Sequence, residues 1–165
     1  MNLAFRLTLF AVLGALGFWL YTVLFPSPEK VVLKRIASLA ATANVSAADG
    51  AITRAAKVSD LIGYFSSDAV INYDTSGGGA RTVSGRDEIR EIAAGGFANV
   101  TSLAVKFQDA TARVGPDQQS AQVGCTAQVS AGDKKDFGIQ ELRFQLKKIE
   151  GDWLITRVET VKTLQ

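Results

Sequence analysis

The sequence predicts an α+β domain in which three N-terminal helices pack on a curved antiparallel sheet, preceded by one N-terminal transmembrane helix. Three observations lead to this prediction. Residues Leu7–Phe25 form an uncharged run of about 19 residues, long enough to cross a bilayer as one helix. Apolar residues recur at helical spacing in three segments between residues 29 and 94, and they alternate with polar residues after residue 100. The chain therefore divides into a transmembrane anchor with a proline linker, residues 1–28, and one domain, residues 29–165.

The apolar run differs from a cleavable signal peptide. The apolar stretch of a signal peptide spans 7–15 residues and leads to a small-residue cleavage site, and neither feature matches this run. Pro26 and Pro28 end the helix, because proline lacks the amide donor and disfavours helix in the preceding residue. Trp19 and Tyr21 lie near its downstream end, where amphipathic rings prefer the headgroup layer. We therefore expect the membrane to be a partner of this chain through Leu7–Phe25.

The orientation of the anchor depends on the chain around it. Lys30, Lys34 and Arg35 follow the run and, by a count of basic residues, favour a cytoplasmic domain. Whole domains can translocate regardless of such charges, and a short polar lead before the bulk of the chain resembles a bacterial signal-anchor. We predict a single-pass protein of the bacterial inner membrane with its C-terminal domain outside the cytoplasm.

The composition excludes several classes of function. The 165-residue chain has a formal net charge of +2, which is too small to favour nucleic acid as a partner. It has no histidine, which excludes Ser-His-Asp catalysis, Cys-His catalysis and His-ligated metals. The single Cys125 lies in an alternating stretch and is expected to be a small buried hydrophobe, since one thiolate does not build a metal site. We therefore expect no metal and no cofactor.

Three segments are predicted to be helices. In the first, Val32, Ile36 and Leu39 recur every three or four residues and so share one face. The third begins with acidic residues in its first turn, which the helix dipole favours. The predicted helices are Glu29–Ala48, which Asp49-Gly50 breaks, Thr53–Phe65, and Arg86–Ala94, which Gly95-Gly96 ends.

The rest of the domain is predicted to form the sheet. A hairpin of Asp68–Asp74 and Arg81–Val83 precedes the third helix. The apolar phase of the next strand shifts near Gln108-Asp109, which predicts a β-bulge, because one extra residue returns the apolar face to the core. Such a bulge would curve the sheet around the helices. Four long strands joined by tight turns complete the domain: Val100–Val114, Ser120–Ser130, Lys135–Lys148 and Trp153–Val161.

This order of elements resembles the nuclear transport factor 2-like superfamily, the cystatin-like cone that includes SnoaL-like domains. The segments that carry the resemblance are the opening helices, DAVINYD at 68–74, TVSGRDEIREI at 82–92 and GDWLITRVETV at 151–161. The resemblance implies a concave sheet that encloses a pocket with the helices. Some members are isomerases, cyclases or dehydratases and others bind or scaffold, including assembly subunits of bacterial secretion systems, so the fold leaves the function open.

A pocket of this kind would be lined by the aromatic residues that pattern inward, although each also suits plain core packing. These are Tyr64, Phe65, Tyr73, Phe97, Phe107, Phe144 and Trp153. Two carboxylates are candidates for acid/base chemistry. Asp109 lies at the predicted bulge, which can re-aim a side chain into a cavity, and Glu141 lies on a predicted strand. The tyrosine and two aspartates of the family's isomerases cannot be assigned position by position, so we predict no catalytic residue.

From these observations we expect a membrane-tethered, non-catalytic module that binds a small apolar ligand or a protein partner. Two alternatives stay open: a SnoaL-like isomerase or cyclase, and an oligomeric scaffold subunit of a membrane assembly. A protein partner or a second copy of the chain would use the sheet face. Its polar residues, which equally suit a solvated surface, are Gln122, Thr126 and Gln128, with Gln140 or Arg143 on the next strand.

Overall fold

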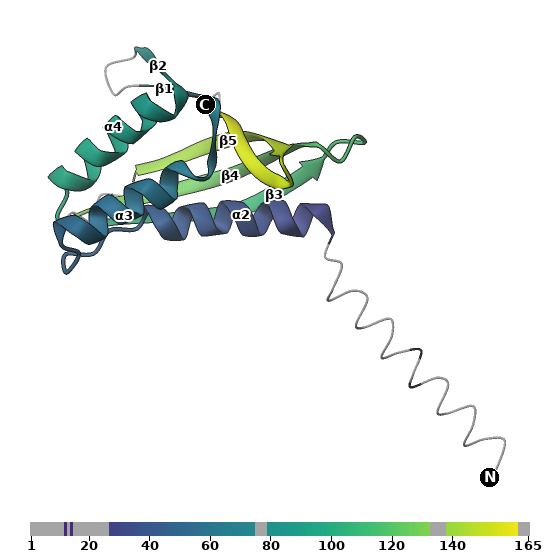
Figure 1. Ribbon diagram of the computed structural model, residues 1–165, viewed down its shortest axis with the longest axis horizontal. Helices are drawn as coiled ribbons and strands as arrows, with labels where there is room; N and C mark the ends of the chain where they lie inside the picture. The colour runs from purple at the N-terminus through teal and green to yellow at the C-terminus, as the bar shows by residue number, and fades with distance from the viewer. Residues whose placement is uncertain (1–11, 13, 15–26, 75–78, 133–137, 162–165) are drawn as a thin grey trace, which may run out of the picture.

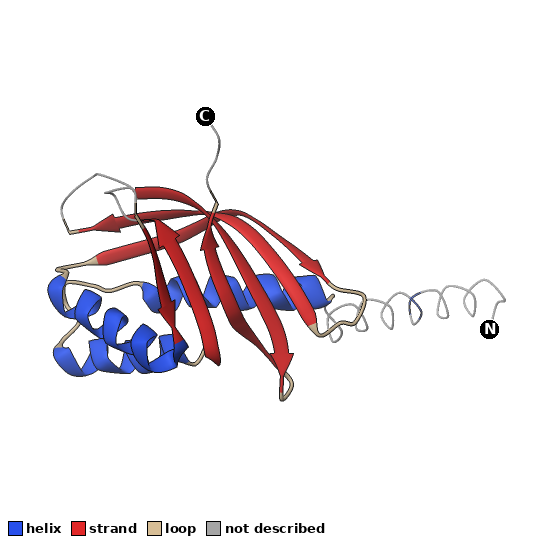
Figure 2. Ribbon diagram, turned by 90° about the horizontal axis from the view of Figure 1, so that it is seen from above, coloured by secondary structure: helices blue, strands red, loops and turns tan. Residues whose placement is uncertain are grey.

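The computed structural model describes residues 12, 14, 27–74, 79–132 and 138–161. Three helices cover one face of a curved, six-stranded sheet (Figures 1 and 2), which confirms the predicted α+β arrangement. The elements follow one another as α2 (Pro28–Ala43), α3 (Ala51–Ile62), β1 (Phe65–Asp74), β2 (Ala80–Ser84), α4 (Gly85–Asn99), β3 (Leu103–Val114), β4 (Ser120–Ala131), β5 (Gly138–Ile149) and β6 (Asp152–Thr160).

The sheet is mixed, so the prediction of a wholly antiparallel sheet is wrong at one pair of strands. The strand order is β2-β1-β6-β5-β4-β3, and β1 runs parallel to β6, whereas the other neighbours are antiparallel. A parallel pair needs a long crossover, which the chain from β2 to β5 supplies here. The alternating pattern of a strand reports which side is buried but not which distant strand it will join.

The first helix is shorter than its apolar spacing predicts, because a tertiary contact replaces its last turn. It ends at Ala43 rather than Ala48. Val45 instead forms two backbone hydrogen bonds with Leu103 at the start of β3, each with an N···O distance of 2.8 Å. The side-chain oxygen of Asn44 accepts another from the amide of Val105 at 2.6 Å. The chain thus pairs with the outer edge of β3 where the sequence pattern predicts helix.

Phe65 belongs to β1 rather than to the second helix, which ends at Ile62. The amide of Ile155 donates to the carbonyl of Tyr64 at 2.8 Å, and Phe65 lies opposite Ile155 in the register of β1 and β6. The carbonyl of Phe65 also accepts a hydrogen bond from Arg86 Nε at 2.7 Å. This pairing with a distant strand outweighs the helical spacing of the local sequence.

Helix α4 is longer than predicted, because Gly95-Gly96 does not end it. A glycine inside a helix costs about 1 kcal/mol relative to alanine, yet α4 continues to Asn99. Its last turn buries Phe97, and Arg54 of α3 donates hydrogen bonds to the carbonyls of Phe97 and Val100. Burial and charged hydrogen bonds together offset the cost of the two glycines.

The predicted β-bulge is confirmed in β3. The register against β4 shifts between Gln108 and Thr111, and Asp109 has a φ of 51°, in the left-handed region. Phe107 before the bulge and Ala112 after it both pack against the core under the helices. The extra residue therefore keeps both halves of the strand facing inward.

Within the described ranges, no helix is both long and apolar enough to span a membrane. The predicted anchor, Leu7–Phe25, lies outside the described residues except for Val12 and Gly14. The anchor, its orientation and the domain boundary at residue 28 therefore stay predictions.

Candidate functional site

The seven aromatic residues predicted to line a pocket belong to one core. Four of them are buried, with 2–6% of their surface exposed: Phe65, Phe97, Phe144 and Trp153. The others are partly buried and pack against the same cluster: Tyr64, Tyr73 and Phe107. The rings of Phe107 and Phe144 meet edge to face, with their centroids 5.5 Å apart. Phe97 also lines a cavity between α3 and α4, and Phe107 lines a groove between α2 and β3.

Tyr64 joins the first two helices. Its hydroxyl shares a hydrogen bond of 3.2 Å with the hydroxyl of Thr42 on α2. The guanidinium of Arg35 lies 4.3 Å from the centroid of its ring and donates to the carbonyl of Gly63 at 3.0 Å. A cation over an aromatic ring is favourable. These contacts give Tyr64 a structural role that needs no ligand.

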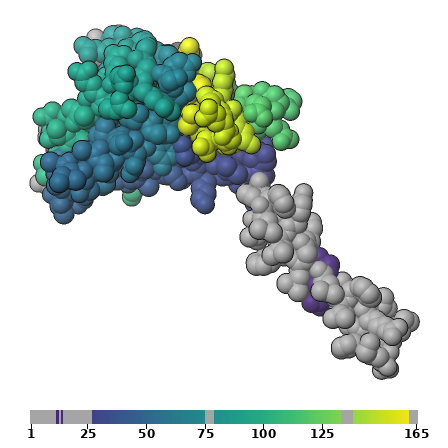
Figure 3. Space-filling view, viewed as in Figure 1, coloured from purple at the N-terminus to yellow at the C-terminus, as the bar shows by residue number. Residues whose placement is uncertain are grey.

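The cavity between α3 and α4, which we name the helix cavity, has a volume of about 650 Å³. Figure 3 shows the two helices side by side on one face of the molecule. The buried side chains of Val58 and Phe97 form its apolar floor. Its walls are exposed alanines placed four residues apart on each helix: Ala51 and Ala55 on α3, and Ala94 and Ala98 on α4.

Of the residues that line the helix cavity, the sequence predicted Phe97 but neither the alanine walls nor the polar rim. Residues four apart on a helix share one face, and both α3 and α4 carry an alanine pair at that spacing. The pairs were available as a signal, but alanine is also common on the outside of ordinary helices. Only the packing of α3 against α4 brings the two pairs together around one space.

Arg54 sets the separation of the two helices at the helix cavity. Its guanidinium donates to the carbonyls of Phe97, Val100 (2.7 Å) and Thr101 (3.2 Å), and its Nε donates to the carbonyl of Asp49 (3.0 Å). A cation near the last carbonyls of α4 also suits the helix dipole. Hydrogen bonds from a charged donor are stronger than neutral ones, so Arg54 gives the cavity a rigid end.

Asp49 and Arg90 complete the rim of the helix cavity. A carboxylate oxygen of Asp49 lies 2.6 Å from Lys57 Nζ and accepts the amide of Ser46 at 2.8 Å. The hydrogen bond from Lys57, followed by the one from Ser46, holds the pKa of Asp49 below its usual value. Arg90 is exposed and reaches Asp87 at 2.6 Å. The rim is therefore polar around an apolar floor.

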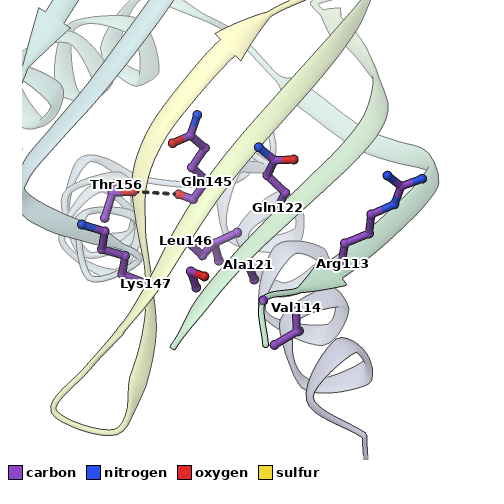
Figure 4. Close-up of a pocket in the computed structure, with 10 residues that line it drawn as sticks. Arg113, Val114, Ala121, Gln122, Gln145, Leu146, Lys147 and Thr156 are labelled. Atoms are coloured by element: carbon purple, nitrogen blue, oxygen red, sulfur yellow. Dashed lines mark hydrogen bonds between the residues drawn. The ribbon is translucent and has the colours of Figure 1, made fainter. Parts of the chain in front are cut away.

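A second hollow, of about 310 Å³, lies on the sheet (Figure 4). Gln122 and Gln145 are cross-strand partners, and their amides lie next to each other between Arg113 and Lys147. Thr156 donates to the carbonyl of Gln145 at 3.2 Å. Arg113 and Lys147 have no ion-pair partner within 4.0 Å among the described residues. The hollow therefore presents amides and cations beside several apolar side chains.

Asp109 and Glu141, the two carboxylates considered for catalysis, line one shallow hollow of about 260 Å³ with Arg143. The bulge of β3 brings them together across three strands, which the sequence did not predict. Both side chains are exposed, whereas a catalytic carboxylate that works near neutral pH needs an apolar surrounding. The hollow therefore lacks the setting that acid/base catalysis requires.

The polar sheet face is only partly as the sequence suggested. Gln122, Thr126 and Gln128 alternate along β4 on the side away from the helices, and Arg143 lies opposite Gly124 on the same side. Gln140 lies opposite Ala127, which is buried under the helices. Arg143 therefore belongs to this face, and Gln140 lies on the inner register.

A groove of about 560 Å³ runs between α2 and β3, and we name it the edge groove. Leu33, Ala37 and Ala41 line it from α2, and Phe107 and Ala110 line it from β3. It shares no lining residue with the helix cavity. It is therefore a second, separate apolar surface.

In the described part of the chain, no three His, Cys, Asp or Glu side chains lie close enough together to hold a metal ion. Cys125 is buried on the inner side of β4, and burial raises the pKa of its thiol to about 11. A thiol of this kind stays protonated at neutral pH and behaves as a small hydrophobe.

No protein-family model matches the chain, and no curated protein matches its sequence. Solved structures resemble it in fold. A nuclear transport factor 2-like protein with a cystatin-like fold from Novosphingobium aromaticivorans is 18% identical, with a TM-score of 0.61 over 79% of this chain and 79% of that chain. A candidate aromatic ring hydroxylase from the same organism is 18% identical, with a TM-score of 0.62 over 82% and 88%.

A third similar structure is a chain in the complex of the yeast deubiquitinase Ubp3 with its cofactor Bre5. It is 18% identical, with a TM-score of 0.51 over 64% of this chain and 84% of that chain. At such identities the likeness shows the fold alone. The described domain therefore has the nuclear transport factor 2-like, cystatin-like fold, as the order of elements in the sequence suggested.

Proposed function

We propose that the chain is a membrane-tethered, non-catalytic module whose helix cavity holds a small apolar ligand. The observation that carries this proposal is the cavity itself: about 650 Å³, with Val58 and Phe97 as its floor and alanines as its walls. Ligand sites in proteins are concave, measure about 300–1,000 Å³, and combine an apolar lining with a few polar groups. Arg54, Asp49 and Arg90 are the polar groups here.

The non-catalytic assignment rests on the chemistry of the remaining side chains. The carboxylates that share a hollow, Asp109 and Glu141, are exposed on the surface of the sheet. The inward tyrosines are committed to the core, and the hydroxyl of Tyr64 is bonded to Thr42. The helix cavity has only one carboxylate, Asp49, which is held by Lys57.

An enzyme of the isomerase or cyclase type is the second candidate. It is supported by the likeness in fold to a protein named as a candidate aromatic ring hydroxylase and by the shared hollow of Asp109 and Glu141. Asp109→Asn tests this candidate once a turnover is measurable, because a true general base loses most of its rate. Unchanged turnover in a folded variant excludes Asp109 from that role.

The membrane tether rests on the sequence of Leu7–Phe25. Helix α2 begins at Pro28, directly after that run, so the proposed domain sits close to the bilayer. Extraction of membranes with alkaline carbonate tests the tether, because a spanning protein remains in the pellet. Release of the full chain into the supernatant would remove this part of the proposal.

A pair of neighbouring alanines tests the helix cavity. Ala55 lines the cavity, whereas Ala56 is also exposed on α3 and does not line it. Ala55→Trp fills the cavity, and Ala56→Trp is the matched control. Native mass spectrometry of the full chain, with naphthalene and dodecane derivatives as probes, should detect adducts on the wild type and on Ala56→Trp and lose them on Ala55→Trp. Adducts that persist on Ala55→Trp, or the absence of adducts on the wild type, would contradict the ligand proposal.

A further inference from the structure

Strand β3 forms one edge of the sheet, and within the described residues backbone pairing covers only the start of that edge. There the chain pairs with β3 itself: Val45 bonds to Leu103, and the side chain of Asn44 bonds to the amide of Val105. The helix α2 that precedes them runs alongside the strand (Figure 1). The chain thus already forms one isolated β-bridge at the start of this edge.

The other end of the edge has outward backbone groups without a partner in the described chain. The amide of Gly115 donates to the carbonyl of Ser120 at 2.8 Å. Hydrogen-bonded and non-bonded positions alternate in an antiparallel ladder, so the backbone groups of Ala112 and Val114 point away from β4. No described residue hydrogen-bonds to these outward groups. An unpaired edge of this kind is a template for another strand.

The edge groove precedes these backbone groups along the strand, because its lining from β3 ends at Ala110. Lys106 and Gln108 lie opposite the outer-face residues Gln128 and Thr126 in the β3–β4 register, yet they line the same groove as Ala37 of α2. The groove therefore opens along the edge of the strand instead of closing beneath the sheet. An extended chain laid on this edge points every second side chain to the same face, which is the face that the groove occupies.

The charges around the edge groove are mostly positive. Lys30 and Lys34 are four residues apart on α2 beside Leu33, and Lys106 and Arg113 lie on β3. None of these four cations has an ion-pair partner within 4.0 Å among the described residues. The one carboxylate on this stretch of β3 is Asp109. An acidic partner therefore matches the groove in charge.

We propose that the edge groove binds an extended, acidic segment of a protein partner, which adds to β3 as a further strand. The backbone of the segment bonds to the outward groups of Ala112 and Val114, and its alternate apolar side chains enter the groove beside Ala41. Its acidic side chains meet Lys34 and Lys106. Backbone bonds of this kind supply affinity, and the groove and charges supply specificity. The site is separate from the helix cavity and does not depend on the function proposed for it.

The test uses a library of random dodecapeptides displayed on phage and panned against the full chain in detergent micelles. We expect enriched peptides that alternate apolar with acidic or β-branched residues. Fluorescence anisotropy of synthetic copies should show Kd rising about tenfold or more, about 1.4 kcal/mol, in Ala112→Pro and in Ala41→Glu. Proline on an edge removes an outward amide without breaking the inner ladder. Lys148→Glu and Ala56→Glu, exposed and away from the groove, are the controls and should keep the wild-type Kd.

Two further readouts separate the possible occupants. Hydrogen exchange of the complex should show new protection of the amides of Ala112 and Val114, and circular dichroism checks that each variant is folded. A dimer in sedimentation whose edge amides are already protected without peptide would make a second copy of the chain the occupant and overturn the peptide assignment. Failure to enrich any peptide, or equal binding by Ala41→Glu, would overturn it as well.

Discussion

Gln122 and Val123 are neighbours on β4, yet they lie on opposite faces of the sheet. Val123 has no exposed surface under the helices, whereas Gln122 is exposed among the amides and cations of the sheet hollow (Figure 4). The same contrast holds on β5 between Phe144, which is 2% exposed, and the half-buried Gln145. Adjacent positions on one strand thus have different roles. One side chain stabilises the core, and the next is available for contacts with another molecule. Truncation of side chains should therefore lower the stability of the domain much more on the inner face than on the outer face.

Truncation of matched residues on the two faces gives the largest expected effect. Phe144→Ala removes a buried ring that contacts Phe107, and we expect a loss of about 3–5 kcal/mol in the free energy of unfolding. Gln145→Ala, on the neighbouring position of the outer face, should change it by less than about 0.5 kcal/mol. Urea unfolding followed by circular dichroism measures both. Similar losses of stability in the two variants would contradict the conclusion that the inner face stabilises the fold more than the outer face.

Cys125 makes the inner face sensitive to alkaline pH. Burial raises the pKa of its thiol from 9.0 to about 11, so the unfolded chain ionises before the folded one. Its contribution to stability is present below pH 9 and is lost as the pH rises towards 11, by about 2 kcal/mol. Cys125→Ala should therefore lose less stability than the wild type between these pH values. Parallel pH curves for the two proteins would show that the thiol is not the buried group described here.

Substitution of the bulge residue Asp109 should have a smaller effect. The bulge is the point on β3 at which the alternation of inward and outward residues shifts by one. The φ of 51° at Asp109 suits aspartate and asparagine but strains a β-branched residue. We expect Asp109→Val to lower the free energy of unfolding by about 1–2 kcal/mol and Asp109→Asn to leave it within about 0.5 kcal/mol. Thermal denaturation of the two variants compares them directly. If valine is tolerated as well as asparagine, the left-handed conformation does not hold the register of β3.

The bulge also shows what kind of structure the sequence could predict. The shift of apolar phase near Gln108-Asp109 is visible in the sequence because burial of one face is required along the whole strand. The same reasoning placed Phe144 and Trp153 inside and Gln122 and Thr126 outside. Features that follow from the local periodicity of apolar residues could therefore be predicted from the sequence alone.

Other features depended on residues far apart in the chain. The pairing of Val45 with Leu103 determines where α2 ends. The continuation of α4 beyond Gly95-Gly96 depends on hydrogen bonds from Arg54. The parallel pairing of β1 with β6 depends on where the chain returns after five other elements. No local propensity carries this information, so the predictions for all three features were wrong.

The candidate sites divide in the same way. The sequence by itself determined the absence of histidine chemistry, the two-faced strands, the bulge and the apolar run of Leu7–Phe25 that predicts a membrane anchor. Only the tertiary structure decided that the predicted aromatic residues share one core, and that alanines of α3 and α4 surround a cavity. It also decided that β3 is an edge beside an apolar groove with cations around it. The physical reason is that burial leaves a periodic record along the chain, whereas a concave surface exists only where separate elements meet.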